Sequence, residues 1–161
     1  MKRRKFLKSF ASASVVASVV SVPTLLSAKD EAKKPKIVSP NKMDLDTAIK
    51  AATGGAKVAD SDKITLTVPE IAENGAVVPV KVKVDHPMTK DSYVKTITVY
   101  ASQNQNVRCV DAVLSPANGK AYFATRIKLG KSQDVVALVG LSDGTFIKAA
   151  KGVKVTIGGC G

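Results

Sequence analysis

From Lys63 onward, polar and apolar residues alternate with a period of two, and this pattern constrains the fold more than any other feature. In "AVVPVKVKV" (Ala76–Val84), the two lysines fall on one face of a strand and the last three valines on the other. Strands with one polar and one apolar face are typical of antiparallel sheets that keep one face in water. The sequence therefore predicts an all-β fold.

Turn residues separate the alternating stretches, and Pro79 lies within one of them. The pairs Asn74-Gly75, Asn118-Gly119 and Asp143-Gly144 favour tight hairpins, because these residues tolerate the positive φ that such turns need. Pro79 lacks an N–H, so its strand is expected to be at a sheet edge or bulged there. Short strands separated by such turns predict an antiparallel β-sandwich. The expected strands are Lys63–Val68, Ala76–Val84, Tyr93–Ala101, Val107–Leu114, Ala121–Leu129, Val135–Leu141, Thr145–Ala149 and Val153–Ile157.

One short helix is expected before the strands. Asp44 or Asp46 can cap its start, and Gly54 with Gly55 can end it, which predicts a helix over about Leu45–Thr53. The segment 29–42 is charged, contains two prolines and little apolar content, and reads as a mobile lead-in.

The N-terminus has the pattern of an export signal. Arg3 and Arg4 lie in "MKRRKFLKSF", and the following stretch Ser9–Ala28 carries no charge. This order resembles a twin-arginine signal, although Lys2 stands where Ser or Thr is usual. A retained membrane anchor is the alternative, but six serines and Pro23 make a poor spanning helix. We expect residues 1–28 to be a removable signal and the mature protein to be periplasmic.

The formal net charge of +12 would by itself suggest a nucleic-acid-binding protein. However, the predicted signal holds five basic residues, which leaves 20 Lys and Arg against 13 Asp and Glu, a net charge of +7. The remaining chain has no dense basic block and few aromatic residues to stack on bases. Small anions or acidic protein surfaces are therefore the more plausible partners.

The sequence offers little for catalysis by common side-chain constellations. His86 is the single histidine, and it lies in "VDHPMT" at an expected strand end. Together with Met88 it could contribute to a copper site, which makes a periplasmic copper-binding β-sandwich the alternative function. No phosphate-cradling glycine loop, Cys-x-x-Cys motif or clustered carboxylate pair is present. A purely structural, adhesion-type domain is a further possibility.

The closing motif "VKVTIGGCG" places Cys160 between glycines. Gly158, Gly159 and Gly161 give backbone freedom and a slim profile, and four residues beyond Ile157 reach roughly 13–14 Å when extended. Such a tail could pass a thiol into a narrow cleft of another protein. The α-carboxylate of Gly161 should oppose ionisation of the thiol, so activation by partner proteins is expected. This favours a carrier over an enzyme; the alternative is a frayed tail with an incidental cysteine.

The other cysteine, Cys109, lies in the middle of an expected strand, "NVRCVDAVL". A small thiol at such a place is an ordinary core residue. A resting disulfide with Cys160 and a link to another chain are the alternatives for an exported protein.

Four stretches of the chain resemble the SoxY family, the sulfur-carrier subunit of the bacterial thiosulfate-oxidising (Sox) system. The resemblance extends from the twin-arginine label over nearly the whole mature chain, and it implies an immunoglobulin-like β-sandwich that pairs with a second β-sandwich subunit, SoxZ. The stretches are "AIKAATGG", "VPEIAENGAVVPVKVKVDHPMT" (Val68–Thr89), "TRIKLGKSQDVVALVGLSDGTF" (Thr125–Phe146) and "VKVTIGGCG".

The resemblance also implies a chemistry. Cys160 would be loaded with thiosulfate by the haem-containing SoxXA, SoxB would hydrolyse off the terminal sulfonate, and SoxCD, where present, would oxidise the remaining sulfane sulfur. The chain itself would be a cofactor-free carrier without a metal. Gly158, Gly159 and Gly161 would form its flexible arm, residues 158–161, attached to a carrier domain of residues 43–157. The family motif commonly ends Gly-Gly-Cys-Gly-Gly, one glycine more than here, and Cys109 is not part of it.

Overall fold

The computed structural model describes residues 43–157. The predicted signal, the lead-in and the C-terminal arm with Cys160 therefore lie outside the described residues. Within the described range, no helix has the length and apolar character needed to cross a membrane.

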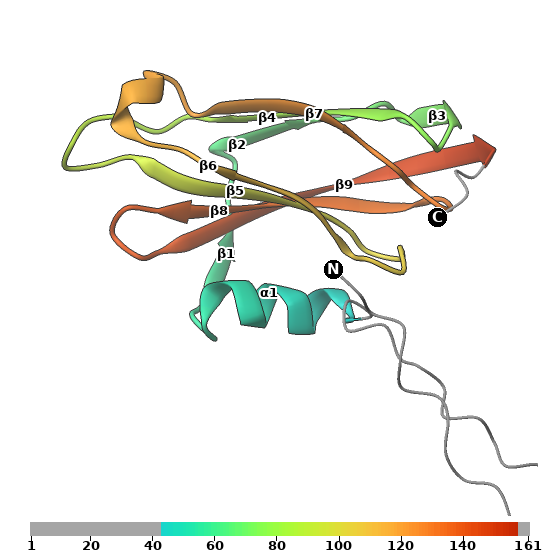
Figure 1. Ribbon diagram of the computed structural model, residues 1–161, viewed down its shortest axis with the longest axis horizontal. Coiled ribbons are helices and arrows are strands. Elements are labelled where there is room, and N and C mark those ends of the chain that lie inside the picture. Colours follow the sequence, from blue (N-terminus) through green and yellow to red (C-terminus); the bar gives the residue numbers. More distant parts are fainter. Residues whose placement is uncertain (1–42, 158–161) are drawn as a thin grey trace, which may run out of the picture. The chain divides into compact units, whose positions relative to one another are not determined.

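The helix α1 (Leu45–Thr53) has the bounds that the sequence predicts. The Thr47 N–H donates to the Asp44 side chain over 2.9 Å, and Gly54 ends the helix at a φ of 63°. An apolar side of the helix then packs on the outer face of the larger of two sheets (Figure 1). The helix residues in this contact are Leu45, Ala48, Ile49 and Ala52, and they meet Tyr100, Val107, Val136 and Leu138.

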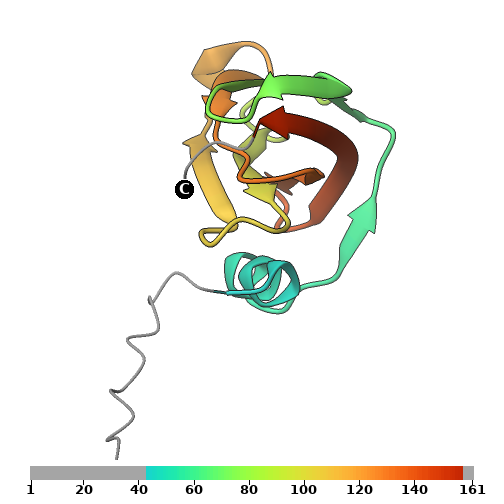
Figure 2. The same ribbon diagram turned by 90° about the vertical axis from the view of Figure 1, so that its right-hand side faces the viewer.

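Two sheets face each other and form the predicted β-sandwich (Figures 1 and 2). A short 3₁₀ helix, η1 (Pro116–Asn118), lies on the connection between them. The larger sheet has the order β1 (Val58–Asp60), β9 (Phe146–Ile157), β8 (Gln133–Leu141), β5 (Val94–Ala101) and β6 (Arg108–Val113), with β3 (Ile71–Asn74) also paired to β9. The smaller sheet has the order β2 (Ile64–Thr67), β4 (Val78–Val84) and β7 (Tyr122–Ile127).

The core lies between the sheets and is built from aliphatic side chains. In β4, buried and exposed residues alternate without interruption, so the face assignment made from the sequence is confirmed. Ile97 and Leu129 are among the largest side chains that are fully buried. Burial of one such side chain stabilises the fold by roughly 1.5–3 kcal/mol, which lets the core form without tryptophan.

The last two predicted strands form one strand in the structure. Thr145–Ala149 and Val153–Ile157 merge into β9, because its pairing with β8 continues through Lys151 and Gly152. Two further strands, β1 and β3, were not predicted, and both run parallel to β9. The sandwich is therefore mainly antiparallel, with two short parallel pairs at β9.

Only one of the three predicted hairpin turns is a hairpin. Asp143-Gly144 joins the paired strands β8 and β9, and Gly144 has a φ of 86°. The prediction was wrong for Asn74-Gly75 and Asn118-Gly119, because these turns connect strands that belong to different sheets. Gly119 has a positive φ of 68° and Gly75 does not, so these dipeptides do not by themselves specify the turn or the pairing of the flanking strands.

Pro79 lies in the middle strand of the smaller sheet. The pairing of β2 with β4 extends only from Val84 to Lys81, so at Pro79 the strand β4 has β7 as its single neighbour in this sheet. The prediction of an edge or bulged strand was therefore wrong for β4 as a whole, but one side of the strand is unpaired at Pro79, which suits a residue without an N–H.

Gly140 provides a test of how tightly β8 packs. An added Cβ would lie 2.6 Å from Thr96 Oγ1 and 3.0 Å from the Phe146 ring. We expect Gly140→Ala to lower the free energy of unfolding by about 1–3 kcal/mol, measured by urea denaturation. Gly152→Ala is the control, since its Cβ meets only the Asp134 carboxylate at 3.3 Å and should have a smaller effect. Equal losses in both variants would contradict this reading of the packing.

Candidate functional site

The residues predicted to carry the cargo, Cys160 with Gly158, Gly159 and Gly161, lie outside the described residues. The structure describes the chain that leads to them as far as Ile157, the last residue of β9. The site is therefore built from the end of β9 and from the loops that hold it. We call Val155, Thr156 and Ile157 the tail base.

The tail base is held by β3 along one edge and by Ser132, at Val155 alone, on the other edge. On one side, β3 pairs with it, and the Gly75 N–H donates to the Ile157 carbonyl over 2.8 Å. The Thr156 hydroxyl adds a bond of 2.9 Å to the Glu73 carbonyl. On the other side the pairing with β8 extends only to Val153, and the Val155 N–H donates to Ser132 Oγ over 2.9 Å. The strand is thus fixed up to the residue that precedes the glycines.

Two loops at the same end of the sandwich are tied to each other and to the tail base. The Leu129 N–H donates to the Gly75 carbonyl over 2.7 Å, so Gly75 contacts both the tail base and the β7–β8 loop. Asn104, in the β5–β6 loop, donates to the Lys128 carbonyl over 2.7 Å and accepts from the Gly130 N–H over 3.1 Å. The end of β9 therefore rests on a connected set of loops.

Gln133 completes the connection between these loops. Its side chain is buried, with 6% exposure, and donates to Asn104 Oδ1 over 2.8 Å and to the Lys131 carbonyl over 3.0 Å. Its own oxygen accepts from the Gln103 N–H over 2.7 Å. A buried amide whose groups are all bonded rigidifies its surroundings, because breaking any one bond leaves a polar group unsatisfied. We call Asn104 and Gln133 the loop bridge.

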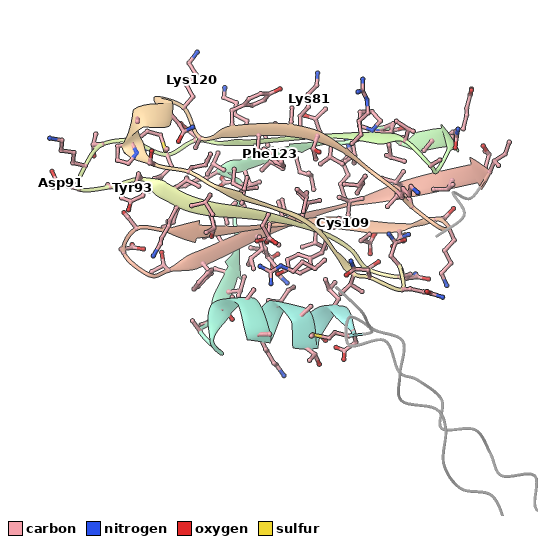
Figure 3. The ribbon with its side chains drawn as sticks, in the orientation of Figure 1. Lys81, Asp91, Tyr93, Cys109, Lys120 and Phe123 are labelled. Carbon is pink, nitrogen blue, oxygen red and sulfur yellow. The ribbon has the colours of Figure 1, made fainter. Side chains whose placement is uncertain are left out.

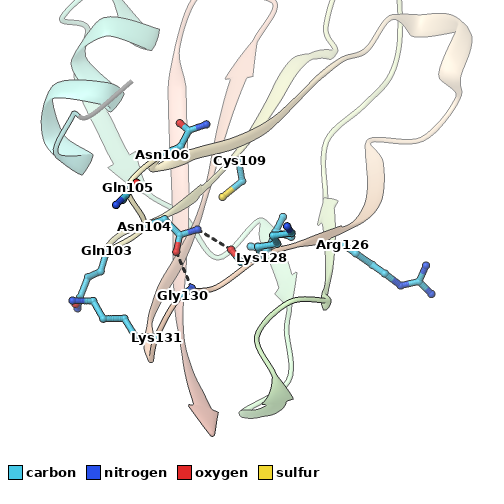
Figure 4. Close-up of a pocket in the computed structure, with 10 residues that line it drawn as sticks. Gln103, Asn104, Gln105, Asn106, Cys109, Arg126, Lys128, Gly130 and Lys131 are labelled. Carbon is cyan, nitrogen blue, oxygen red and sulfur yellow. Dashed lines mark hydrogen bonds between the residues drawn. The ribbon is translucent and has the colours of Figure 1, made fainter. Parts of the chain in front are cut away.

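Between the two bridged loops lies an open cavity of about 630 Å³ (Figure 4). Asn104 lines it but uses its side-chain atoms in the loop bridge, and Arg126 points away from it in Figure 4. Cys109 lies on its wall. The cavity wall thus carries one thiol beside the cationic residues Lys128 and Lys131.

Cys109 occupies a β-bulge on the edge strand β6. Val99 pairs with Val110 and Tyr100 pairs with Arg108, so Cys109 is the extra residue between them. Its side chain packs against the core, as the core-thiol interpretation predicts. Burial raises the pKa of the Cys109 thiol to about 11, so little thiolate is present at neutral pH. The alternative of a disulfide with Cys160 involves a residue outside the described range.

The two residues considered for copper are engaged in local structure. The His86 Nε2 lies 3.1 Å from Ser92 Oγ, and the Met88 sulfur accepts from the Val94 N–H at 3.4 Å. Within residues 43–157, no group of three or more His, Cys, Asp or Glu side chains could hold a metal ion. The geometry gives the copper-binding alternative no support.

Loss of the loop bridge should destabilise this end of the sandwich. We expect Asn104→Ala to lower the free energy of unfolding by about 1–3 kcal/mol in urea denaturation, since it leaves the Lys128 carbonyl and the Gly130 N–H without their partner. The neighbouring Gln105→Ala, at an exposed position, is the control and should change stability little. Matching stability of the two variants would refute the role assigned to Asn104.

The raised pKa of Cys109 predicts slow alkylation. In a Cys160→Ser variant, the rate of reaction with N-ethylmaleimide should be low at pH 7.5 and rise about tenfold per pH unit, with no plateau until the pH approaches 11. The rate follows the thiolate fraction, which burial suppresses. The same variant unfolded in urea should react much faster at pH 7.5. A plateau near pH 8–9 in the folded protein would show that the thiol is not shielded.

Comparisons with known proteins agree with this architecture. The family model for sulfur oxidation protein SoxY matches residues 49–160. The sulfur carrier protein SoxY from Chlorobium limicola f thiosulfatophilum is similar over 70% of this chain and 96% of its own, with 32% identity and a TM-score of 0.60. A comparison with curated protein sequences gives no match.

A superoxide reductase (neelaredoxin) from Ignicoccus hospitalis is also similar in structure, with a TM-score of 0.52 and 20% identity over 58% of this chain and 80% of its own. At that identity the likeness concerns the fold alone. The family match covers more than half of the chain, and the structural match to a SoxY protein covers more than two thirds. The chain therefore belongs to the SoxY family of sulfur oxidation proteins.

Proposed function

We propose that this chain is a covalent carrier in thiosulfate oxidation and that its cargo is held on Cys160. The observation that carries the proposal is the family match, which extends to residue 160 and thus includes the glycine-flanked cysteine. The similar protein from Chlorobium limicola f thiosulfatophilum is itself described as a sulfur carrier. The tail base supports the proposal, because a strand fixed up to Ile157 gives the following residues a defined starting point.

The loading step joins the cysteine sulfur to the outer sulfur of thiosulfate. The thiol loses its proton, a sulfur–sulfur bond forms, and two electrons pass one at a time through the haem of SoxXA to an external electron acceptor, leaving Cys160–S–S–SO₃⁻. Hydrolysis by SoxB then adds one water and breaks the bond between the sulfane sulfur and the sulfonate. The products are sulfate, one proton and a persulfide, Cys160–S–SH, that stays on the chain. SoxCD, where present, oxidises that sulfane sulfur.

In this scheme the chain contributes attachment and delivery, and the enzymes contribute the chemistry. It would act as a cofactor-free subunit in the periplasm after removal of residues 1–28, in a heterodimer with SoxZ. Gly158, Gly159 and Gly161 would allow Cys160 to enter the different clefts of its partners. Cys109 would not compete for cargo, since its buried thiol is a poor nucleophile at neutral pH.

Intact mass spectrometry tests the carrier function. The protein lacking residues 1–28 is incubated in its complex with SoxZ, together with SoxXA, thiosulfate and an electron acceptor. We expect a mass increase equal to one thiosulfate, which disappears on treatment with SoxB and leaves one additional sulfur.

Two variants assign the position of the adduct. Cys109→Ser should load like the unmodified protein, whereas Cys160→Ser should not load at all. Equal loading of Cys160→Ser, or no adduct on the unmodified protein, would end the proposal.

A further inference from the structure

The outer face of the smaller sheet carries positive charge and no carboxylate. Strands β2, β4 and β7 contain Lys81, Lys83 and Arg126 but neither Asp nor Glu, and all three cations are exposed. Figure 3 shows Lys81 pointing away from the sandwich. We call Lys81, Lys83 and Arg126 the basic face. The larger sheet differs, because its strands mix cations with Asp60, Glu73, Asp111 and Asp134.

No cation of the basic face belongs to an ion pair among residues 43–157. The ion pairs among residues 43–157 are Arg108–Asp111 and Lys148–Asp60, and both belong to the larger sheet. Small polar residues border the cations, since Thr67 and Thr65 are the cross-strand partners of Lys81 and Lys83. Such a face presents cations at its surface that are available to an external anionic group.

The basic face begins close to the tail base. Arg126 pairs with Pro79 at the end of the smaller sheet that follows the turn at Gly75. Gly75 donates to the Ile157 carbonyl, and its own carbonyl accepts from Leu129, which follows Arg126 by three residues. Exposed Val77 lies between Gly75 and Pro79, the residue that pairs with Arg126. Gly75 thus joins the end of β9 to Leu129, a residue three positions after the first cation of the face.

This neighbourhood limits where a partner can bind. Cys160 follows Ile157 by three residues, a span of at most roughly 10–11 Å in an extended chain. An enzyme that acts on Cys160 must therefore bring its active site close to the tail base. The surface around its active-site entrance would then lie against the neighbouring part of this chain.

We propose that the basic face docks an acidic surface bordering the active-site entrance of the enzyme that loads Cys160. This inference rests on the proposed carrier function. The face suits short-lived, charge-steered association, because permanent interfaces bury mostly apolar residues and few lysines. A second copy of the chain would oppose like charges, so the occupant is an acidic protein surface.

Charge reversal tests the docking surface. The loading rate of Cys160 is measured by intact mass at several concentrations of SoxXA and of NaCl. We expect Lys81→Glu/Arg126→Glu to raise the KM for the carrier at least tenfold at low salt, with kcat changed less than twofold. The corresponding double glutamine variant should give an intermediate KM, and the difference between variants should shrink as salt increases.

The matched control is Lys57→Glu/Lys151→Glu, which makes the same change in net charge at exposed positions away from the smaller sheet. The KM of this control should stay within about twofold of the value for the unmodified protein, because a change in net charge alone has only a small effect on KM. Alkylation of Cys160 by iodoacetamide should be equal in all variants, which shows that the tail itself is unaltered. Equal KM values in the two charge-reversed variants would overturn the docking proposal, while absence of any adduct on the unmodified protein would instead overturn the carrier function.

Lipid binding is the competing occupant. Cosedimentation with phosphatidylglycerol vesicles should be weak and the same for the basic-face variant and its control. Strong cosedimentation that only the basic-face reversal abolishes would assign this face to a membrane surface and contradict the proposal.

Discussion

The pairing of β9 is the constraint on which the rest of the structure depends. This strand of 12 residues pairs with β1 and β8 along its first part and with β3 at its end, so it joins the larger sheet to the tail base. The pairing of β9 with β8 ends where Val153 lies opposite Gln133, the first residue of β8. Beyond this point the Ser132 hydroxyl is the partner of Val155. On one edge β9 pairs with β1 at Phe146 to Lys148 and with β3 from Lys154 to Ile157, and on the other edge its partners extend to Val155.

The proposed carrier needs a firmly held body and a tail that moves, and a single segment cannot meet both requirements. Backbone that is paired on both sides resists local opening, whereas a segment with few buried contacts opens at little cost. The described pairing reaches Ile157, so in the proposed carrier any freedom of the arm would begin after the fixed end of β9. The loop bridge extends the ordered region sideways, since Asn104 and Gln133 connect the loops that contact Gly75.

The surroundings of Cys109 suit the proposal that Cys160 is the thiol that reacts. Cys109 lies at a bulge, where the extra residue of an edge strand turns its side chain toward the core. Burial raises its pKa, so it stays protonated under conditions in which an unburied thiol is partly ionised. In the proposed carrier, a second accessible thiolate would attack the cargo on Cys160 and form a disulfide with loss of the sulfur species. The bulge thus removes a competing nucleophile.

The sequence predicted the elements that are specified by residues close together in the chain. The helix bounds follow from Asp44 and Gly54, and the alternation in β4 follows from its valines and lysines. The strands β1 and β3 carry no alternation, and they are strands because β9 lies beside them. For the same reason the loop bridge could not be foreseen, because Asn104 and Gln133 are distant in sequence. The sequence does single out Cys160 and its glycines, and that assignment stays a prediction.

The energetics of a glycine-rich tail explain why the proposed carrier needs a docking surface on its body. Glycine loses more conformational freedom than other residues when it is fixed, so binding of residues 158–161 in an enzyme cleft costs entropy and is weak by itself. Once the body is docked, entry of the tail becomes an intramolecular step with a high effective concentration, provided that the docked surface lies within reach. A charged face next to the tail base meets this condition, and its polar character keeps the association reversible. Reversibility is essential for a carrier that must pass the same sulfur atom from one enzyme to the next.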